Sequence, residues 1–201
     1  MDTPDHASRL GPQRACDAAL LARYARGERH AARELAARHL PRILGFAARM
    51  LDDPAEAEDV AQEAMLRLWR IAPRWQPERA AISTWLYRVT ANLCTDRLRQ
   101  RQVRKGVAIE DTEEPQDARP GALAGLIAAD RGAALEAALG GLPQRQRMAV
   151  VLRHIEGLSN PEIAAVMEIG VEAVESLTAR GRRALSAQLA ARREELGYDD
   201  E

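Results

Sequence analysis

The segment ISTWLYRVTANLCTDRLRQRQVRK, residues 82–105, has the pattern of one long amphipathic helix. Ser83 is suited to cap the first turn, and apolar side chains return at helical spacing to form one stripe. The stripe consists of Ile82, Leu86, Val89, Leu93 and, less regularly, Leu98. Aromatic residues make up only 3% of the chain, and Ala, Leu and Arg are frequent. Together these features predict an all-α fold.

The other faces of this segment are basic and aromatic. Trp85 and Tyr87 lie near its start, and Asp96 is its single acid. Basic side chains hold phosphates, and exposed aromatic rings stack unpaired bases. A solvated surface helix and a nucleic-acid-binding helix both fit this pattern, so both interpretations stay open here. The basic residues are Arg88, Arg97, Arg99, Arg101, Arg104 and Lys105.

Composition excludes several classes of protein. The chain has 201 residues, 46% of them hydrophobic, so a packed core is possible. Cys16 and Cys94 are too few for a disulfide framework or a zinc site, and we expect no metal and no cofactor. No glycine-rich phosphate loop and no serine–histidine or cysteine–histidine motif is present, so we expect no catalytic residue and no enzyme. With no apolar run of membrane length and no secretory signal, a cytoplasmic protein is expected.

The first half of the chain reads as several helices. Residues 1–16 resemble a loose tail, and Asp17 is expected to cap a helix that ends at Gly27. In the next helical pattern, Pro41 either kinks a helix or opens a new one. Asp53, with Pro54 at the first helical position, begins a helix whose apolar side faces the core. Its other faces carry Asp59, Gln62, Glu63, Leu66 and Trp69.

A connector and a linker flank the basic segment. Trp75 lies between Pro73 and Pro77 just before it, where a ring could receive an unstacked base. After it, residues 106–121 read as a flexible acidic linker. Either a plain solvated linker or a mimic of nucleic-acid charge fits its acids, and both stay open. These acids are Glu110, Asp111, Glu113, Glu114 and Asp117.

The second half, residues 122–193, predicts a helix-turn-helix. Pro143 opens one helix, and Ser159 with Glu162 forms a capping box for a short helix. Gly170 is expected to make the turn before a longer helix with outward basic residues. Residues 194–201 form an acidic tail.

Two of these blocks, in this order, resemble the extracytoplasmic-function (ECF) group of bacterial RNA polymerase sigma factors. AEDVAQEAMLRLWR followed by STWLYRVTANLCTDRLRQ resembles sigma region 2, within residues 17–105. LPQRQRMAVVLRHIEGLSNPEIAAVM with VEAVESLTARGRRAL resembles region 4. The resemblance implies two small helical domains, a region 2 bundle and a region 4 helix-turn-helix. It also implies a stress-responsive initiation factor that melts the minus-ten element, with core polymerase, promoter DNA and an anti-sigma factor as partners and no membrane.

The resemblance also implies a role for each surface. The helix after Asp53 would dock on core polymerase, whose beta and beta-prime subunits are the implied partners. The basic helix and its connector would hold the melted minus-ten strand, and the last helix would enter the major groove of the minus-thirty-five element. Implied polymerase contacts are Asp59, Gln62, Glu63 and Trp69. Implied minus-ten contacts are Trp75, Trp85, Tyr87, Arg88, Asn92, Arg97 and Arg99. Implied minus-thirty-five contacts are Glu172, Glu175, Ser176, Ala179, Arg180 and Arg183.

Two other functions are compatible with the same residues. An autonomous helix-turn-helix regulator would bind duplex DNA as a dimer, with the N-terminal half as sensor. A helical adaptor would bind another protein and no DNA. The recognition helix departs from the family pattern at Glu175 and Leu177, where basic residues are usual. The promoter sequence that other family members recognise therefore does not predict the one that this protein recognises.

Overall fold

The computed structural model describes residues 6–78, 80–107 and 123–191 of the chain. Every regular element within these ranges is helical, which confirms the predicted all-α class. The acidic linker residues from Glu110 to Asp117 and the tail 194–201 lie outside them. The elements are α1 (His6–Ala25), α2 (Arg29–Leu51), α3 (Pro54–Ile71), η1 (Ala72–Arg74), α4 (Ile82–Val107), α5 (Leu123–Gly140), α6 (Gln144–Val150), η2 (Val151–Ile155), α7 (Asn160–Met167) and α8 (Val171–Ala191).

The first helix begins before the predicted position. Asp17 does not cap α1 but lies inside it, buried, where its carboxylate accepts hydrogen bonds from His39 Nε2 at 2.9 Å and Arg38 Nη1 at 3.0 Å. Burial would raise the pKa of Asp17, but the hydrogen bonds and charges of His39 and Arg38 outweigh it and lower that pKa. This contact ties α1 to α2. The predicted stop is confirmed, because α1 ends at Ala25 and Gly27 takes φ +97°.

Helices α2 and α3 follow their local signals closely. Pro41 does not divide α2, which runs through it from Arg29 to Leu51. Asp53 caps α3 as predicted, since its Oδ1 accepts the backbone N–H of Glu56 at 3.1 Å and Pro54 occupies the first helical position. Buried residues of α3 include Val60, Ala64, Met65 and Leu68, the predicted core face.

Helix α4 is rotated from the predicted orientation. It begins at Ile82, so Ser83 lies inside its first turn and does not act as the N-cap. Val89, Leu93 and Leu98 are only half-buried. The buried side instead combines large and small residues, because α2 and α3 approach closely enough to enclose small side chains. That side consists of Ile82, Leu86, Tyr87, Thr90, Ala91 and Cys94.

The helix-turn-helix forms as predicted, with one difference at its turn. The Glu162 carboxylate accepts the Ser159 backbone N–H at 3.0 Å and its hydroxyl at 2.7 Å, which completes the capping box. The residue in left-handed conformation is Glu168, with φ 54°, rather than Gly170. Gly170 provides the carbonyl that accepts Val174 N–H at 3.2 Å as α8 starts.

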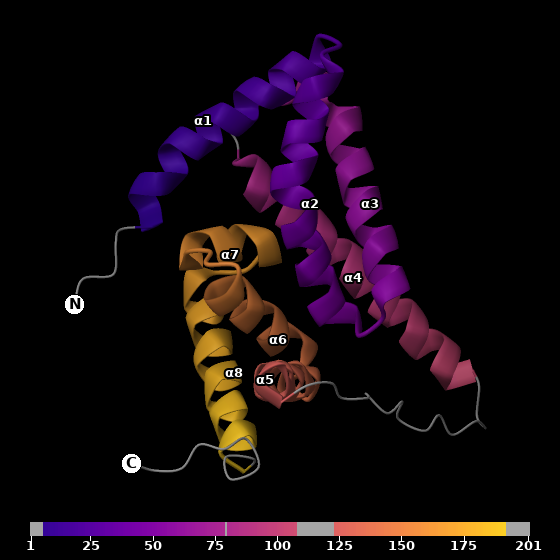
Figure 1. Ribbon diagram of the computed structural model, residues 1–201, viewed down its shortest axis with the longest axis vertical. Helices are drawn as coiled ribbons and strands as arrows, with labels where there is room; N and C mark the ends of the chain where they lie inside the picture. Colours follow the sequence, from indigo (N-terminus) through magenta and orange to yellow (C-terminus); the bar gives the residue numbers. More distant parts are fainter. Residues whose placement is uncertain (1–5, 79, 108–122, 192–201) are drawn as a thin grey trace.

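The two halves pack against each other (Figure 1). Helices α1 to α4 form the first half and α5 to α8 the second, and α7 lies against α4. One continuous cluster of buried apolar residues includes Phe46 and Leu86 of the first half and Leu152 and Ile163 of the second. The chain is therefore two helical bundles that share a packed boundary.

Gly181 is where α8 lies closest to α6. A Cβ at this position would lie 2.6 Å from Val150 Cγ2 and 3.3 Å from the Gln146 carbonyl oxygen. We expect Gly181→Ala to lower the free energy of unfolding by about 1–3 kcal/mol, since the added methyl overpacks a tight contact. Urea denaturation measures this change. Gly132→Ala is the matched control, because nothing lies within 4 Å of its Cβ and alanine favours the helix. Equal stability of the two variants would contradict the close approach.

Candidate nucleic-acid interface

The outward side of α4 gathers four of the predicted strand-binding residues. At 3.6 residues per turn, Trp85, Arg88, Asn92 and Arg99 fall within about 60° of one another around the helix axis. Asn92 and Arg99 are exposed, and Trp85 and Arg88 are half-buried. This face lies opposite the buried side of α4, so packing in the core determines where it points. It can offer phosphates two guanidinium groups and bases an amide and an indole ring.

The arginines of α4 divide into two groups. Within the described part of the chain, neither Arg88 nor Arg99 has an acidic partner within salt-bridge distance. Arg97 lies on the other side of the helix, near Cys94. Arg101 is held by the start of α3: its guanidinium donates to Asp53 Oδ2 at 3.0 Å and to the Leu51 carbonyl at 2.9 Å. Arg101 therefore spends its charge within the fold, whereas Arg88 and Arg99 leave theirs available to a ligand.

Tyr87 does not lie on an outer face as predicted. It is 2% exposed, and its ring meets Phe46 edge-on at 5.6 Å between centroids. Its hydroxyl donates a hydrogen bond to Glu156 of the second half. Burial and the Glu156 carboxylate raise the pKa of Tyr87 well above its usual range. In this arrangement Tyr87 is a core residue, and no base can reach it.

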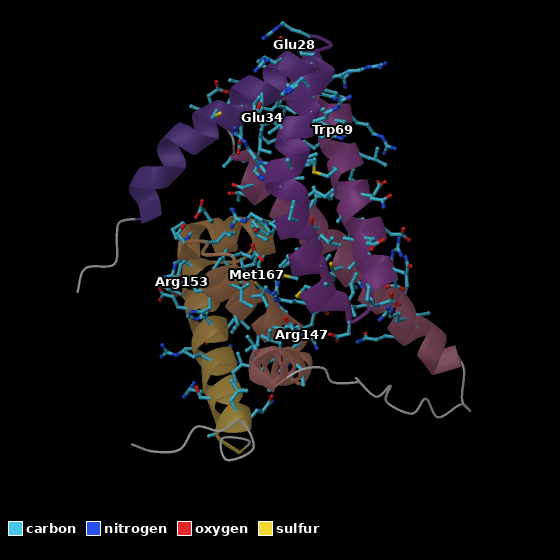
Figure 2. The ribbon with its side chains drawn as sticks, in the orientation of Figure 1. Glu28, Glu34, Trp69, Arg147, Arg153 and Met167 are labelled. Atoms are coloured by element: carbon cyan, nitrogen blue, oxygen red, sulfur yellow. The ribbon has the colours of Figure 1, made fainter. Side chains whose placement is uncertain are left out.

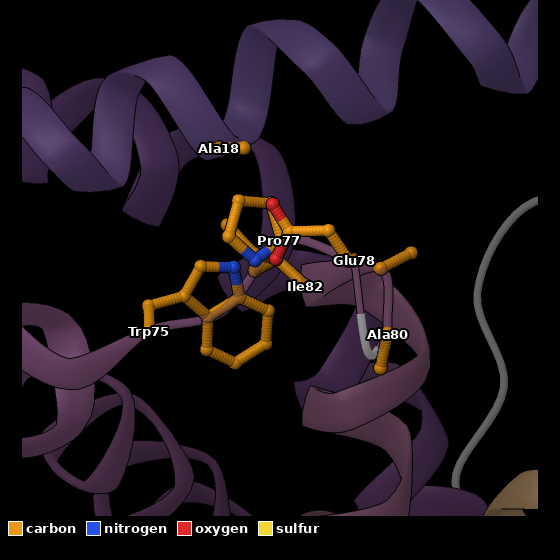
Figure 3. A pocket seen from close by; sticks show the side chains of 7 residues that line it. Ala18, Trp75, Pro77, Glu78, Ala80 and Ile82 are labelled. Carbon is orange, nitrogen blue, oxygen red and sulfur yellow. The ribbon is translucent and has the colours of Figure 1, made fainter.

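Trp75 lines a small cavity before α4 (Figure 3). The cavity measures about 170 Å³ and lies between Trp75, Pro77 and Glu78 on one side and Ala18 of α1 on another. The indole meets Trp85 edge-on at 6.0 Å between ring centroids, and its Nε1 is buried with no hydrogen-bond partner among the residues that the structure describes. Trp75 and Trp85 thus link the connector to the outward side of α4.

The outward side of α3 carries the predicted polymerase contacts. Asp59 and Gln62 are exposed. Glu63 accepts from Arg67 Nε at 2.8 Å, which lowers the pKa of Glu63. Trp69 is half-buried, because its ring packs on Tyr24 of α1 at 4.8 Å between centroids. Only part of the Trp69 side chain therefore remains available to a partner.

Leu66 lies on this face, as the sequence predicted, but it was not among the predicted polymerase contacts. It is 48% exposed and lies among Asp59, Gln62 and Glu63 on the helical wheel. An exposed leucine amid polar residues forms the apolar centre that protein interfaces use. The available signal was its position opposite the buried stripe of α3.

The recognition helix α8 presents its predicted contacts to solvent. All six candidates are exposed, and one of them is held in place: Asn160 Nδ2 donates to Glu175 Oε1 at 3.3 Å. This contact joins α7 to α8 across the turn. The exposed candidates are Glu172, Glu175, Ser176, Ala179, Arg180 and Arg183.

Beside α8 lies a basic hollow that the sequence reasoning also missed. It measures about 270 Å³ and is lined by Arg153, His154 and Arg182, by the single acid Glu175, and by Asn160, Thr178 and Ala179. Burial and the charges of Arg153 and Arg182 lower the pKa of His154. No spacing in the sequence joins the end of η2 to the middle of α8, so only the fold brings these residues together.

Metal binding and membrane insertion would each need a recognisable feature of the structure. Among the residues that the structure describes, no group of three His, Cys, Asp or Glu side chains is placed to hold a metal ion. In the same part of the chain, no helix combines the length and the apolar character needed to cross a membrane.

Comparison with known proteins decides the family. A family model described as Sigma-70 region 2 matches residues 35–104, and one described as Sigma-70, region 4 matches residues 132–185. The ECF RNA polymerase sigma factor SigM of Mycobacterium tuberculosis is 35% identical over 176 residues, covering 86% of this chain and 84% of that protein. The chain belongs to the ECF group of the sigma-70 family. Members of this family are transcription initiation factors rather than enzymes, and they bind core RNA polymerase and promoter DNA.

Further relatives of this sigma factor agree. The ECF RNA polymerase sigma factor SigE of Mycolicibacterium smegmatis is 36% identical over 158 residues. That match covers 78% of this chain, and the chain spans 61% of the relative. The solved structure of CnrH in complex with the cytosolic domain of CnrY is 31% identical, with a TM-score of 0.65, and the match covers 87% of this chain and 97% of that one.

The orientation of α4 can be tested with its thiol. Cys94 is buried, and burial raises the pKa of its thiol to about 12, whereas Cys16 is exposed. We therefore expect Ellman's reagent at pH 8 to react at once with one of the two thiols of the folded sigma factor. The second should react only after denaturant is added. An Asn92→Cys variant supplies the control, since its added thiol should react at once. Rapid reaction of Cys94 would contradict the assigned rotation.

Proposed function

We propose that this ECF sigma factor directs core RNA polymerase to specific promoters through three surfaces on two domains. Residues 17–105 would form the polymerase and minus-ten domain and residues 122–193 the minus-thirty-five domain, with 106–121 as their linker. The observation that carries the proposal is the outward side of α4, where Arg88 and Arg99 lie beside Asn92 and Trp85 and have no acidic partner among the described residues. Such a side is suited to a nucleic-acid strand.

Strand capture would proceed without nucleotide hydrolysis. Unstacking a base costs a few kcal/mol, and stacking it on an aromatic ring returns about 1–3 kcal/mol per base. Trp75 and Trp85 supply neighbouring rings, and the arginines of α4 hold the backbone. Captured bases therefore offset the opening of a short promoter segment.

The α3 face would dock on core polymerase, on a basic surface of the beta-prime subunit. Asp59 and Glu63 supply negative charge, and Leu66 supplies an apolar contact. The α8 face would enter the major groove of the minus-thirty-five element. There Arg180 and Arg183 suit phosphates or guanine, and Ser176 suits a base edge.

Regulation by an anti-sigma factor belongs to the same proposal. The solved structure of CnrH, a protein 31% identical to this one, contains the cytosolic domain of CnrY. A comparable protein would hold this sigma factor until a stress signal releases it. Its place of action would be the cytoplasm, where core polymerase is found.

The proposal is tested by transcription from a cognate promoter with purified core polymerase. We expect transcripts with this protein and none without it. Tight binding to duplex DNA in the absence of polymerase would favour the autonomous regulator. Binding to protein partners without any transcript would favour the helical adaptor.

Strand holding by α4 predicts the effect of a double substitution. Arg88→Ala with Asn92→Ala should reduce open-complex formation about tenfold or more, because two contacts that include a charged one are lost. Permanganate footprinting of the minus-ten region measures the opening. Arg26→Ala, which removes an exposed arginine in the turn after α1, should leave it unchanged. Normal opening by the double variant would refute the assignment.

The α3 face predicts that Leu66 contributes to polymerase affinity. Leu66→Asp should weaken binding of core polymerase by about tenfold or more, because it places a charge in the apolar centre of an interface. Fluorescence anisotropy with labelled protein measures the affinity. Leu66→Met should stay within about twofold of wild type, and both variants should unfold at the wild-type temperature because the side chain is exposed. Equal affinities for the two variants would remove Leu66 from the interface.

A further inference from the structure

Glu175 places an acid on the side of α8 that would meet DNA. At 3.6 residues per turn, Glu172, Ser176, Ala179 and Arg183 fall within about 60° of one another around the helix axis. Glu175 lies at the edge of this group, about 40° beyond Ala179. All five residues are exposed. A duplex that contacts this side of α8 therefore meets a carboxylate.

Asn160 holds that carboxylate from the neighbouring helix. It is the half-buried first residue of α7, and its Nδ2 donates to Glu175 Oε1 at 3.3 Å across the turn. The other oxygen of the carboxylate, Oε2, makes no hydrogen bond or ion pair within the described part of the chain. One oxygen is thus anchored, and the other is available as an acceptor.

Two arginines flank Glu175 in the basic hollow. Arg182 lies about 20° from Glu175 around the axis of α8, and Arg153 reaches the hollow from η2. Figure 2 shows Arg153 beside α8, and its Nη1 donates to the Leu158 carbonyl at 3.0 Å. Positive charges in these positions suit the phosphates that flank a contacted base. They also offset the repulsion between a carboxylate and the DNA backbone, so an acid is tolerated here.

A carboxylate only accepts hydrogen bonds, so Glu175 selects bases that present a donor. In the major groove guanine offers the acceptors O6 and N7, and thymine offers the acceptor O4 and a methyl group. Adenine offers its N6 amine, but the N7 acceptor beside it repels a carboxylate. Cytosine offers its N4 amine without a neighbouring acceptor. Cytosine is therefore the base that suits Glu175.

We infer that Glu175 selects a cytosine in the minus-thirty-five element by accepting a hydrogen bond from the cytosine 4-amino group, and that Asn160 positions the carboxylate. The inference rests on the proposed function, because it names the base that one residue of the α8 face reads. A basic residue at the same position would donate to guanine instead. The acid therefore gives this sigma factor a base preference that a basic residue could not.

Promoter selection with the holoenzyme tests the inference. A promoter that wild-type protein transcribes with core polymerase is first selected from random DNA, and its minus-thirty-five positions are then randomised. Sequencing of the transcribed templates gives the base preference at each position. We expect wild type to prefer cytosine by about tenfold at one position of one strand, because a mismatch at a contacted base weakens binding to that extent.

Glu175→Gln should change the preferred base at that position alone. The amide keeps an oxygen for Asn160, and glutamine pairs with adenine N6 and N7. The preference should therefore move from cytosine to adenine by about tenfold, while the other positions keep their wild-type bases. A Glu175→Gln profile that matches wild type at every position would overturn the inference.

Glu168→Gln is the matched control. It removes an exposed acid from the turn before α8 and so changes the net charge of the domain equally. We expect its base preferences to equal those of wild type. If Glu168→Gln shifts the same position as Glu175→Gln, the effect comes from net charge, and cytosine reading is overturned.

Asn160→Ala tests the positioning role separately. Without its anchor the carboxylate can turn away from the base, so the cytosine preference should fall to about threefold or less while cytosine stays the preferred base. A merely structural role of Asn160 would lower transcription from all templates alike and leave the tenfold ratio unchanged. That result would remove Asn160 from the inference.

The same selection separates this failure from that of the proposed function. If wild-type protein with core polymerase transcribes no template from the random DNA, the proposed function fails and the cytosine contact falls with it. If wild type transcribes selected promoters and Glu175→Gln prefers the same bases, only the cytosine contact fails.

Discussion

The rotation of α4 about its own axis is the constraint on which the other surfaces depend. Ile82, Leu86 and Cys94 bury one side of the helix in the first bundle, where α4 packs on both α2 and α3. Since side chains keep fixed angles around a helix, the side with Arg88 and Asn92 must face outward. Tyr87 lies on the buried side, and its hydroxyl reaches Glu156 of the second bundle. The rotation of α4 therefore determines both which side can bind a strand and which residues meet the other domain.

That boundary differs in character from the interior of either bundle. Apolar packing supplies its area, but buried charged groups supply much of its pairing, through Arg147 and Glu156. A buried ion pair adds little net stability, because desolvation offsets attraction, yet it penalises other arrangements strongly. Charged groups also regain water when the halves part. The charged contacts thus specify one arrangement of the packed halves, and water can solvate the same groups if the halves separate.

The sequence predicted the features that depend on residues close together in the chain. Asp53 and the pair Ser159 and Glu162 formed their caps as expected, because each hydrogen bond joins residues three apart. The predictions were wrong where the position of a side chain depends on a partner far away in the sequence. Asp17 looked like a cap but meets His39, 22 residues later, and Tyr87 looked outward but meets Glu156, 69 residues later. No local pattern encodes such pairs, so the sequence could not show that Tyr87 leaves the outward side of α4, and strand binding by that side stays a prediction.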